Sequence, residues 1–149
     1  MIDLTVFLLS VVLAWCCWHC FVQKEASLCS PLVYVRIAEC FLEEDEIVES
    51  DAAVTKAGTV VESIQNPEQH MALILRYKST YARVLDANRK FLQAASRYHD
   101  LSNSSGNLIR AEDLLAMLGR AATCAILAPS GPQRQRVLVH VSFTCAVLL

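Results

Sequence analysis

The sequence feature that most constrains the fold is a run of apolar residues at helical spacing in the second half of the chain. Five residues stand at i, i+3, i+4, i+7 and i+10 and share one helix face: Phe91, Ala94, Ala95, Tyr98 and Leu101. The alanines let a neighbouring helix approach closely, and the aromatic rings fill the gaps. Upstream, Leu85 closes one helix and residues 86–88 form a turn, with Asn88 as the N-cap of the next helix. The stretch therefore predicts two packed helices joined by a turn.

The first half of this middle region shows the same period. A helix is expected from Leu32, and its apolar face comprises Val33, Ile37, Phe41 and Leu42. The acidic residues 43–46 end it in a solvated turn. A second helix is expected over 47–64, weakened at Gly58 by about 1 kcal/mol relative to alanine. Its predicted inward face consists of Val48, Ala52, Val60, Val61 and Ile64.

Two further helices are expected beyond residue 66. Pro67 suits the first turn of a helix that ends at Leu85. The apolar face of that helix comprises Met71, Ile74, Leu75, Tyr81, Ala82 and Leu85. A last helix is expected from about Leu108 to Leu127, between a loop at residues 102–106 and the Pro-Ser-Gly-Pro stop at residues 129–132.

These helices form pairs that repeat along the chain. The spacing is roughly 40–45 residues, so that residues 37–38 correspond to 81–82, and residues 52–53 approximately to 94–95. This pattern predicts an all-α fold of degenerate helix–turn–helix (TPR-like) repeats, a fragment of an α-solenoid with an apolar N-terminal helix. Two pairs and one extra helix make a short solenoid, so we expect the chain to depend on a partner for burial of its apolar faces.

The composition excludes several classes of protein. A chain of 149 residues is long enough for one domain. Its residues are 54% hydrophobic and 19% charged, a composition that excludes a disordered chain. The formal net charge of −2 gives no bulk electrostatic reason to expect nucleic-acid binding. Seven cysteines, an odd and scattered set, favour a reducing compartment over a disulfide scaffold.

Charge is distributed unevenly, and this predicts three segments. Residues 1–23 are apolar, residues 24–136 carry almost all the charge and form the helical-repeat domain, and residues 137–149 are an apolar tail. The tail ends in VHVSFTCAVLL, which is interpreted either as a β-strand or as a translated intron.

The N-terminal segment has several interpretations. Leu4 to Val22 holds no acidic residue, lysine or arginine and is long enough to span a bilayer as a helix. The segment fits a signal peptide less well, because Asp3 stands where a basic residue is expected and no convincing A-x-A cleavage site follows. An aberrant start of the gene model is a third interpretation, and a buried helix is a fourth. Cys16, His19 and Cys20 share one helix face, but without a second ligand pair they are better explained as apolar residues than as a zinc site.

Four basic residues near the central turn are the candidate binding residues. Arg89 and Lys90 are expected in the first turn of their helix, Arg97 seven residues after Lys90, and Arg83 before the turn. Together they predict a small basic patch for an acidic partner protein, with an ordinary solvated surface as the alternative.

No catalytic, cofactor-binding or metal-ligating residues are predicted. The chain has no H-E-x-x-H, P-loop, G-x-G-x-x-G or G-x-S-x-G motif. His70, His99 and His140 each stand alone in the sequence. With a helical-repeat pattern, this favours a scaffold or binding module over an enzyme, with no cofactor and no small-molecule substrate.

Three blocks of the chain resemble a known family. YVRIAECFLEEDE, YKSTYARVLDANRKFLQAASRYHDLS and RAATCAILAPSGPQRQRVL are similar to the fourth-subunit family of the COP9 signalosome, over about Leu32 to Leu138. The resemblance implies a helical-repeat arm that precedes a winged-helix PCI domain. Upstream of Leu32 and after Leu138 the chain departs from the family pattern, which suggests a fragment or an aberrant gene model and puts assembly into the complex in doubt.

The resemblance also implies a function. The signalosome removes the ubiquitin-like modifier Nedd8 from cullin-RING ubiquitin ligases, and its metalloprotease centre lies in a different subunit. The expected role is therefore a non-catalytic scaffold in cytoplasm and nucleus, with the other signalosome subunits and cullin-RING ligases as partners. The alternative is a single-pass membrane-anchored helical-repeat adaptor, held by residues 4–22 with Lys24 and Arg36 on the cytoplasmic side. A zinc or redox enzyme using residues 16–20 is a third hypothesis.

Overall fold

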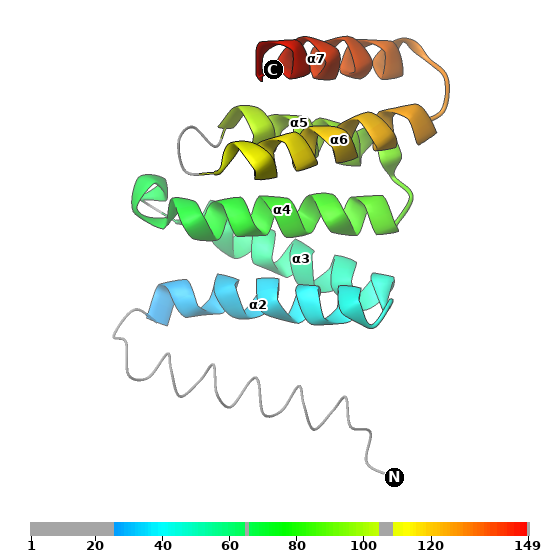
Figure 1. Cartoon of the computed structure of the whole chain (residues 1–149). Coiled ribbons are helices and arrows are strands. Elements are labelled where there is room, and N and C mark those ends of the chain that lie inside the picture. The colour runs from blue at the N-terminus through cyan, green and yellow to red at the C-terminus, as the bar shows by residue number, and fades with distance from the viewer. Residues whose placement is uncertain (1–25, 65, 105–108, 149) are drawn as a thin grey trace. The chain divides into compact units, whose positions relative to one another are not determined.

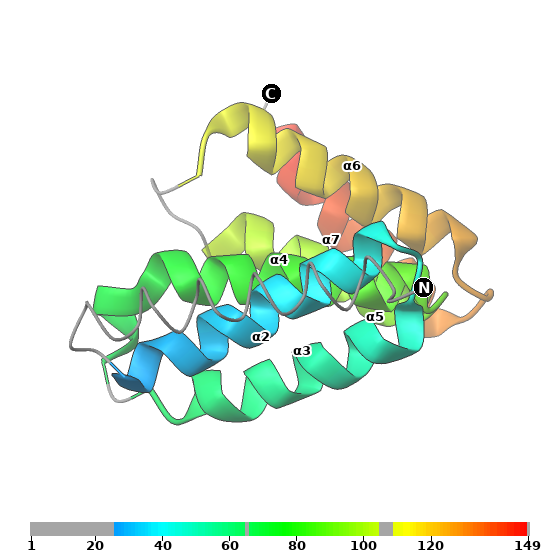
Figure 2. The same ribbon diagram turned by 90° about the horizontal axis from the view of Figure 1, so that it is seen from below.

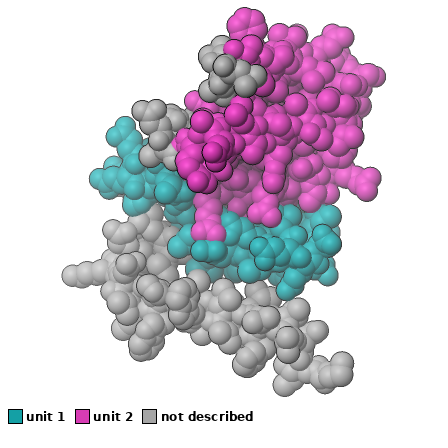
Figure 3. All heavy atoms as spheres, in the orientation of Figure 1, with its two compact units in different colours: residues 1–73 teal, residues 74–149 magenta. Residues whose placement is uncertain are grey.

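The computed structural model describes residues 26–64, 66–104 and 109–148, and all of the secondary structure in these residues is helical (Figure 1). The expected all-α fold is confirmed. The elements are α2 (Ala26–Glu43), α3 (Ile47–Glu62), the 3-10 helix η1 (Pro67–His70), α4 (Met71–Ala87), α5 (Phe91–Ser104), α6 (Ala111–Leu127) and α7 (Pro132–Leu148). They fall into two compact units, residues 1–73 and 74–149 (Figure 3), and each is described by itself.

The first unit contains the antiparallel helix pair α2 and α3, which lie side by side in both ribbon views (Figures 1 and 2). Small residues bring the two helices close together. Val35 and Ala38 of α2 and Val54 of α3 are completely buried. Ser50, also completely buried, donates a hydrogen bond of 2.9 Å from its hydroxyl to the Ala38 carbonyl. This bond satisfies a polar group that would otherwise destabilise the interface.

The turn between α2 and α3 is closed by backbone geometry. Asp45 adopts a left-handed conformation with φ 60°, and the Glu46 amide donates 2.9 Å to the Phe41 carbonyl. This is the long hydrogen bond of a Schellman helix end. The side chains of residues 43–46 are all exposed, so the predicted solvated acidic turn is confirmed.

The predicted inward face of α3 is wrong. Val48 is 75% exposed and Ala52 is exposed, whereas the buried residues of the helix are Ser50, Ala53, Val54, Ala57 and Gly58. The reason is size. A face of alanine, glycine and serine allows the α2 backbone to approach closely, and that approach buries more of both helices than a face of bulkier valines would.

The second unit contains α5, α6, α7 and nearly all of α4. Four of the five residues predicted for the face of α5 are buried, because Ala94, Ala95, Tyr98 and Leu101 are at most 2% exposed, whereas Phe91 is half-buried. Helix α5 packs against α6 and α7, and α6 packs against α7. The other buried residues of this unit are Leu75, Thr80, Ala82, Val84 and Leu85 on α4, Leu118, Ala121, Cys124 and Ala125 on α6, Ala128 at the end of α6, and Val141 on α7.

The turn between α4 and α5 differs from the prediction. Helix α4 continues through Ala87, and Arg89 adopts a left-handed conformation with φ 58°. The Lys90 amide donates 2.9 Å to the Leu85 carbonyl, and the Arg89 amide donates 2.9 Å to the Asp86 backbone carbonyl. Asn88 therefore belongs to the end of α4 and is not the N-cap of α5. Arg89 and Lys90 precede α5 instead of lying in its first turn, because this Schellman end uses arginine where glycine is the common signal.

The C-terminal region is helical. Pro132 begins α7, as proline often does, and the helix continues to Leu148, so the interpretation of the tail as a β-strand is wrong. The predicted boundary between residues 136 and 137 falls within this helix, and α6 begins at Ala111, three residues after the predicted start. Val141 is buried, whereas Val139 and Phe143 are 61% and 74% exposed.

The predicted N-terminal helix, its membrane-span interpretation and the Cys16–Cys20 cluster lie outside the described residues. Among the helices that the structure describes, none combines the length and the apolar character that crossing a membrane requires.

Candidate functional site: an arginine groove

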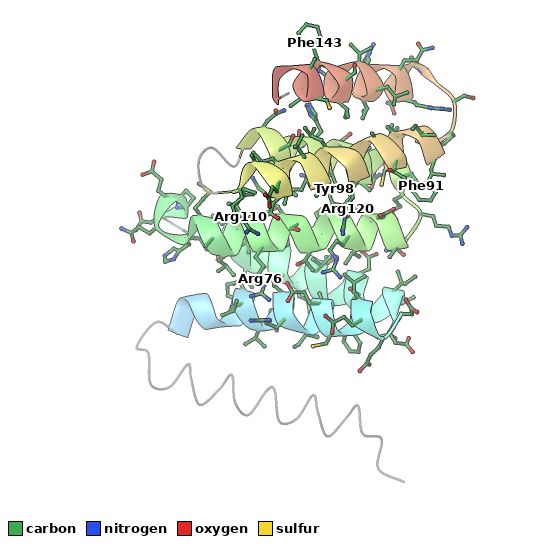
Figure 4. The ribbon with its side chains drawn as sticks, in the orientation of Figure 1. Arg76, Phe91, Tyr98, Arg110, Arg120 and Phe143 are labelled. Atoms are coloured by element: carbon green, nitrogen blue, oxygen red, sulfur yellow. The ribbon has the colours of Figure 1, made fainter. Side chains whose placement is uncertain are left out.

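The described part of the second unit contains a charged groove with a volume of about 560 Å³. We call it the arginine groove, because Arg76, Arg83, Arg110 and Arg120 line it together with Tyr98. Figure 4 labels the first, third and fourth of these arginines and Tyr98 among the side chains around α4 and α6. The remaining lining residues are Leu75, Ser79, Ile109, Asp113, Ala116 and Met117.

Helical periodicity positions the basic side chains. Arg76 and Arg83 stand seven residues apart on one face of α4, and Asp113 and Arg120 stand seven apart on one face of α6. Helices α4 and α6 run in the same direction (Figures 1 and 2). Arg76 and Arg110 stand toward the N-terminal ends of these helices, and Arg83 and Arg120 stand farther along them.

Arg110 is held in place by the start of α6. It occupies the N-cap position with φ −67° and ψ 149°, and its Nε donates 3.1 Å to an Asp113 carboxylate oxygen. This ion pair is exposed and stabilises the fold by less than about 1 kcal/mol. Its consequence is geometric, because it fixes the direction of the Arg110 side chain at the end of the groove.

Tyr98 presents the groove with a buried polar group. The side chain is 2% exposed, and its hydroxyl has no partner with hydrogen-bond geometry among the described residues. Burial raises the pKa of Tyr98, the Arg120 guanidinium lowers it by acting as a hydrogen-bond donor and by its charge, and the Asp86 carboxylate raises it. The hydroxyl is therefore protonated at neutral pH and available as a donor.

The four predicted basic residues do not lie in one pocket. Arg83 lines the arginine groove, whereas Arg97 lines a second pocket of about 600 Å³ together with Tyr81, Asp100 and Arg136. The Arg97 guanidinium carbon lies 5.3 Å from the centre of the Tyr81 ring, a cation–π contact. Arg89 and Lys90 are exposed in the turn before α5.

Sequence reasoning missed Arg76, Arg110 and Arg120. Arg76 comes from α4, whereas Arg110 precedes α6 and Arg120 lies within it, and the sequence gives no signal that residues of these two helices line one groove.

The histidines predicted to stand alone are partly brought together. The rings of His99 on α5 and His140 on α7 lie 5.9 Å apart between centres, and His99 Nε2 is 3.1 Å from the Thr144 hydroxyl. The described residues contain no group of three or more histidine, cysteine or acidic side chains that could hold a metal ion.

The buried Cys124 of this unit is not an activated nucleophile. Its thiol donates to an Asp86 carboxylate oxygen at 3.4 Å, and burial together with the Asp86 charge raises the pKa of Cys124 to about 12. A thiol with that pKa is protonated at neutral pH, and the thiolate is the reactive form.

Comparison with curated proteins finds relatives that share one name, COP9 signalosome complex subunit 4. The chain is 43% identical over 109 residues to the Arabidopsis thaliana protein. The aligned region covers 70% of this chain and 26% of that protein. The chain is 38% identical over 106 residues to the Dictyostelium discoideum protein, covering 71% and 25% of the two chains. It is 35% identical over 117 residues to the Drosophila melanogaster protein, covering 78% and 27%. The chain thus spans about a quarter of the length of these relatives, and no family model matches it.

Proposed function

Because the chain belongs, over its aligned residues, to the family of COP9 signalosome complex subunit 4, we propose that it acts as a non-catalytic scaffold and interaction subunit of that complex. Through protein contacts it supports the removal of Nedd8 from cullin-RING ubiquitin ligases. Its partners are the other signalosome subunits and the cullin-RING ligases, and it acts in cytoplasm and nucleus. The observation that carries the proposal is the identity of 33–43% with four relatives of that name.

The surfaces of the described residues support a binding role. Stacked helix pairs present helix faces and grooves, which are the surfaces that repeat proteins use for partners. The arginine groove and the pocket beside Arg97 offer charge and concavity. The buried Cys124 thiol is held protonated by Asp86, which supports a role without nucleophilic chemistry.

Co-purification tests the proposal. The native protein is captured with an antibody to residues 81–100, and the captured proteins are identified by peptide mass spectrometry. We expect the other signalosome subunits in the captured set. Recovery of the chain alone, or in a membrane pellet that resists carbonate, would contradict the proposal; the latter would support an anchor at residues 4–22.

A matched pair of variants tests whether the helical fold carries the interaction. Ala95→Arg introduces a charge at a position of 0% exposure on α5 and should abolish co-purification of the tagged chain. Asn103→Arg introduces the same charge at an exposed position of the same helix, outside the arginine groove and the pocket beside Arg97, and should leave it unchanged. Equal co-purification of both variants would mean that the contacts do not need this fold.

A further inference from the structure

We propose that the arginine groove binds an acidic segment of a protein partner, whose carboxylates pair with Arg83 and Arg120 and accept a hydrogen bond from the Tyr98 hydroxyl. That the occupant is a protein segment rests on the proposed scaffold function.

The first observation is the charge of Arg83 and Arg120, two of the four arginines that line the groove. Four arginines line the groove, and Asp113 is the one acidic residue among the described lining residues. That carboxylate is engaged by Arg110 at 3.1 Å. Arg83 and Arg120 form no ion pair with another described residue. Like charges gathered on one concave surface repel one another, and an anionic occupant removes that repulsion.

The second observation is the Tyr98 hydroxyl. The Arg120 guanidinium acts on this oxygen as a hydrogen-bond donor and cannot accept its proton, so the hydroxyl of a side chain that is 2% exposed has no acceptor of good geometry among the described residues. Tyr98 lines the groove beside Arg120. A carboxylate that pairs with Arg120 would lie within reach of this hydroxyl and would satisfy both groups at once.

The spread of the charges determines the kind of anion. From Arg110 to Arg120 the backbone of α6 rises by about 15 Å, at 1.5 Å per residue. A single carboxylate or phosphate is far shorter than that distance. A peptide of about five extended residues covers it, at about 3.3 Å per residue. The charges therefore fit a segment with several acidic residues better than one small ion.

The uncharged lining refines the sequence of that segment. Leu75, Ile109, Ala116 and Met117 form an apolar part of the same surface. An acidic segment with one or two apolar side chains between its carboxylates would bury them there, since Met adapts its shape to irregular partners.

Fluorescence anisotropy of a labelled hexaglutamate peptide, titrated with the full chain, tests the proposal. We expect saturable binding that Arg83→Gln and Arg120→Gln each weaken roughly tenfold, the effect of losing one charge-assisted hydrogen bond. Tyr98→Phe should weaken it roughly fivefold. Arg120→Lys, which keeps the charge but loses the planar fork, should give an intermediate result. Circular dichroism of every variant establishes that the helices are retained.

Arg134→Gln is the matched control, because it removes the same charge from α7 without touching the groove. Equal weakening by Arg134→Gln would overturn the proposal, since binding would then follow net charge alone. Absence of binding, or full binding by Tyr98→Phe, would also overturn it. Displacement of the peptide by an equal concentration of inorganic phosphate would show that the groove holds a small anion, which contradicts a peptide site.

Failure of the groove proposal and failure of the scaffold proposal give different results in these experiments. Loss of peptide binding with retained co-purification of signalosome subunits would remove the groove proposal alone. Peptide binding without co-purification would remove the assignment to the complex and leave the groove as an acidic-peptide site.

Discussion

The Cys124 thiol on α6 donates a 3.4 Å hydrogen bond to an Asp86 carboxylate oxygen on α4. The contact joins two helices that are separated by the whole of α5 in the sequence. Burial is the first cause of the raised Cys124 pKa of about 12, and the Asp86 charge is the second. Because the hydrogen bond needs the protonated thiol, the same contact stabilises the fold and suppresses thiol chemistry.

This relationship predicts how stability depends on pH. The pKa of Cys124 rises from 9.0, its value in the unfolded chain, to about 12 in the fold. The protonated thiol is therefore favoured by the folded state, and its stabilisation is complete below about pH 9. It decreases as pH rises from about 9 toward about 12.

Alkylation by iodoacetamide measures how far the Cys124 thiol is held protonated and shielded in the folded chain. In the folded chain the Cys124 peptide should remain unmodified up to strongly alkaline pH, whereas in urea its alkylation rate should rise around pH 9. Equal rates in the two states, followed by peptide mass spectrometry, would show that the thiol is not held by this contact.

Arg89→Gly should stabilise the second unit. Arg89 has φ 58°, a conformation that penalises a side chain but not glycine, so a gain of about 0.5–1 kcal/mol in the free energy of unfolding is expected. Urea denaturation measures it. Arg89→Ala removes the same charge but retains a Cβ atom, and it should give no such gain. Equal gains by both variants would assign the effect to charge.

Ser50→Ala should destabilise the first unit by about 1 kcal/mol, because it removes a buried hydrogen bond between α3 and α2. Thermal unfolding followed by circular dichroism measures the change. Ser142→Ala is the control, since that hydroxyl is exposed and bonds only within its own helix, to Val139. Its effect should stay within about 0.5 kcal/mol. Similar losses at both sites would mean that the Ser50–Ala38 bond contributes nothing specific.

Tyr98→Phe should leave the fold as stable as before, or stabilise it by about 1 kcal/mol. The variant removes a buried hydroxyl whose proton has no acceptor of good geometry among the described residues, and such a group is costly to bury. Urea denaturation of the chain without peptide checks this. A clear loss of stability would reveal a structural partner for the hydroxyl and would weaken its assignment as a ligand donor.

The parts of the fold that the sequence predicted well are those that depend on local periodicity. The α5 face of Ala94, Ala95 and Tyr98 follows from spacing alone, and the acidic turn after α2 follows from charge. The buried face of α3 was missed because small residues, not the most apolar ones, set how closely two helices approach. Asn88 was assigned to the wrong helix because an arginine takes the left-handed position after it.

The arginine groove could not be read from the sequence for a different reason. Its charges come from α4, from the residue before α6 and from α6 itself, so they become neighbours only through packing around Tyr98. The predicted basic patch relied on proximity along the chain. Helical twist instead directs Arg83 and Arg97 to different pockets.

The two Schellman turns have a consequence for how such a chain diversifies. In each turn the backbone makes the closing hydrogen bond, from Glu46 to Phe41 and from Lys90 to Leu85. The closing hydrogen bond uses no side-chain atom, although the left-handed positions Asp45 and Arg89 favour glycine, and the two turns carry opposite charges, acidic at residues 43–46 and basic at residues 89–90. Substitutions at the loop edge of each repeat can therefore change its charge, and with it the partners that it attracts, while the architecture stays constant.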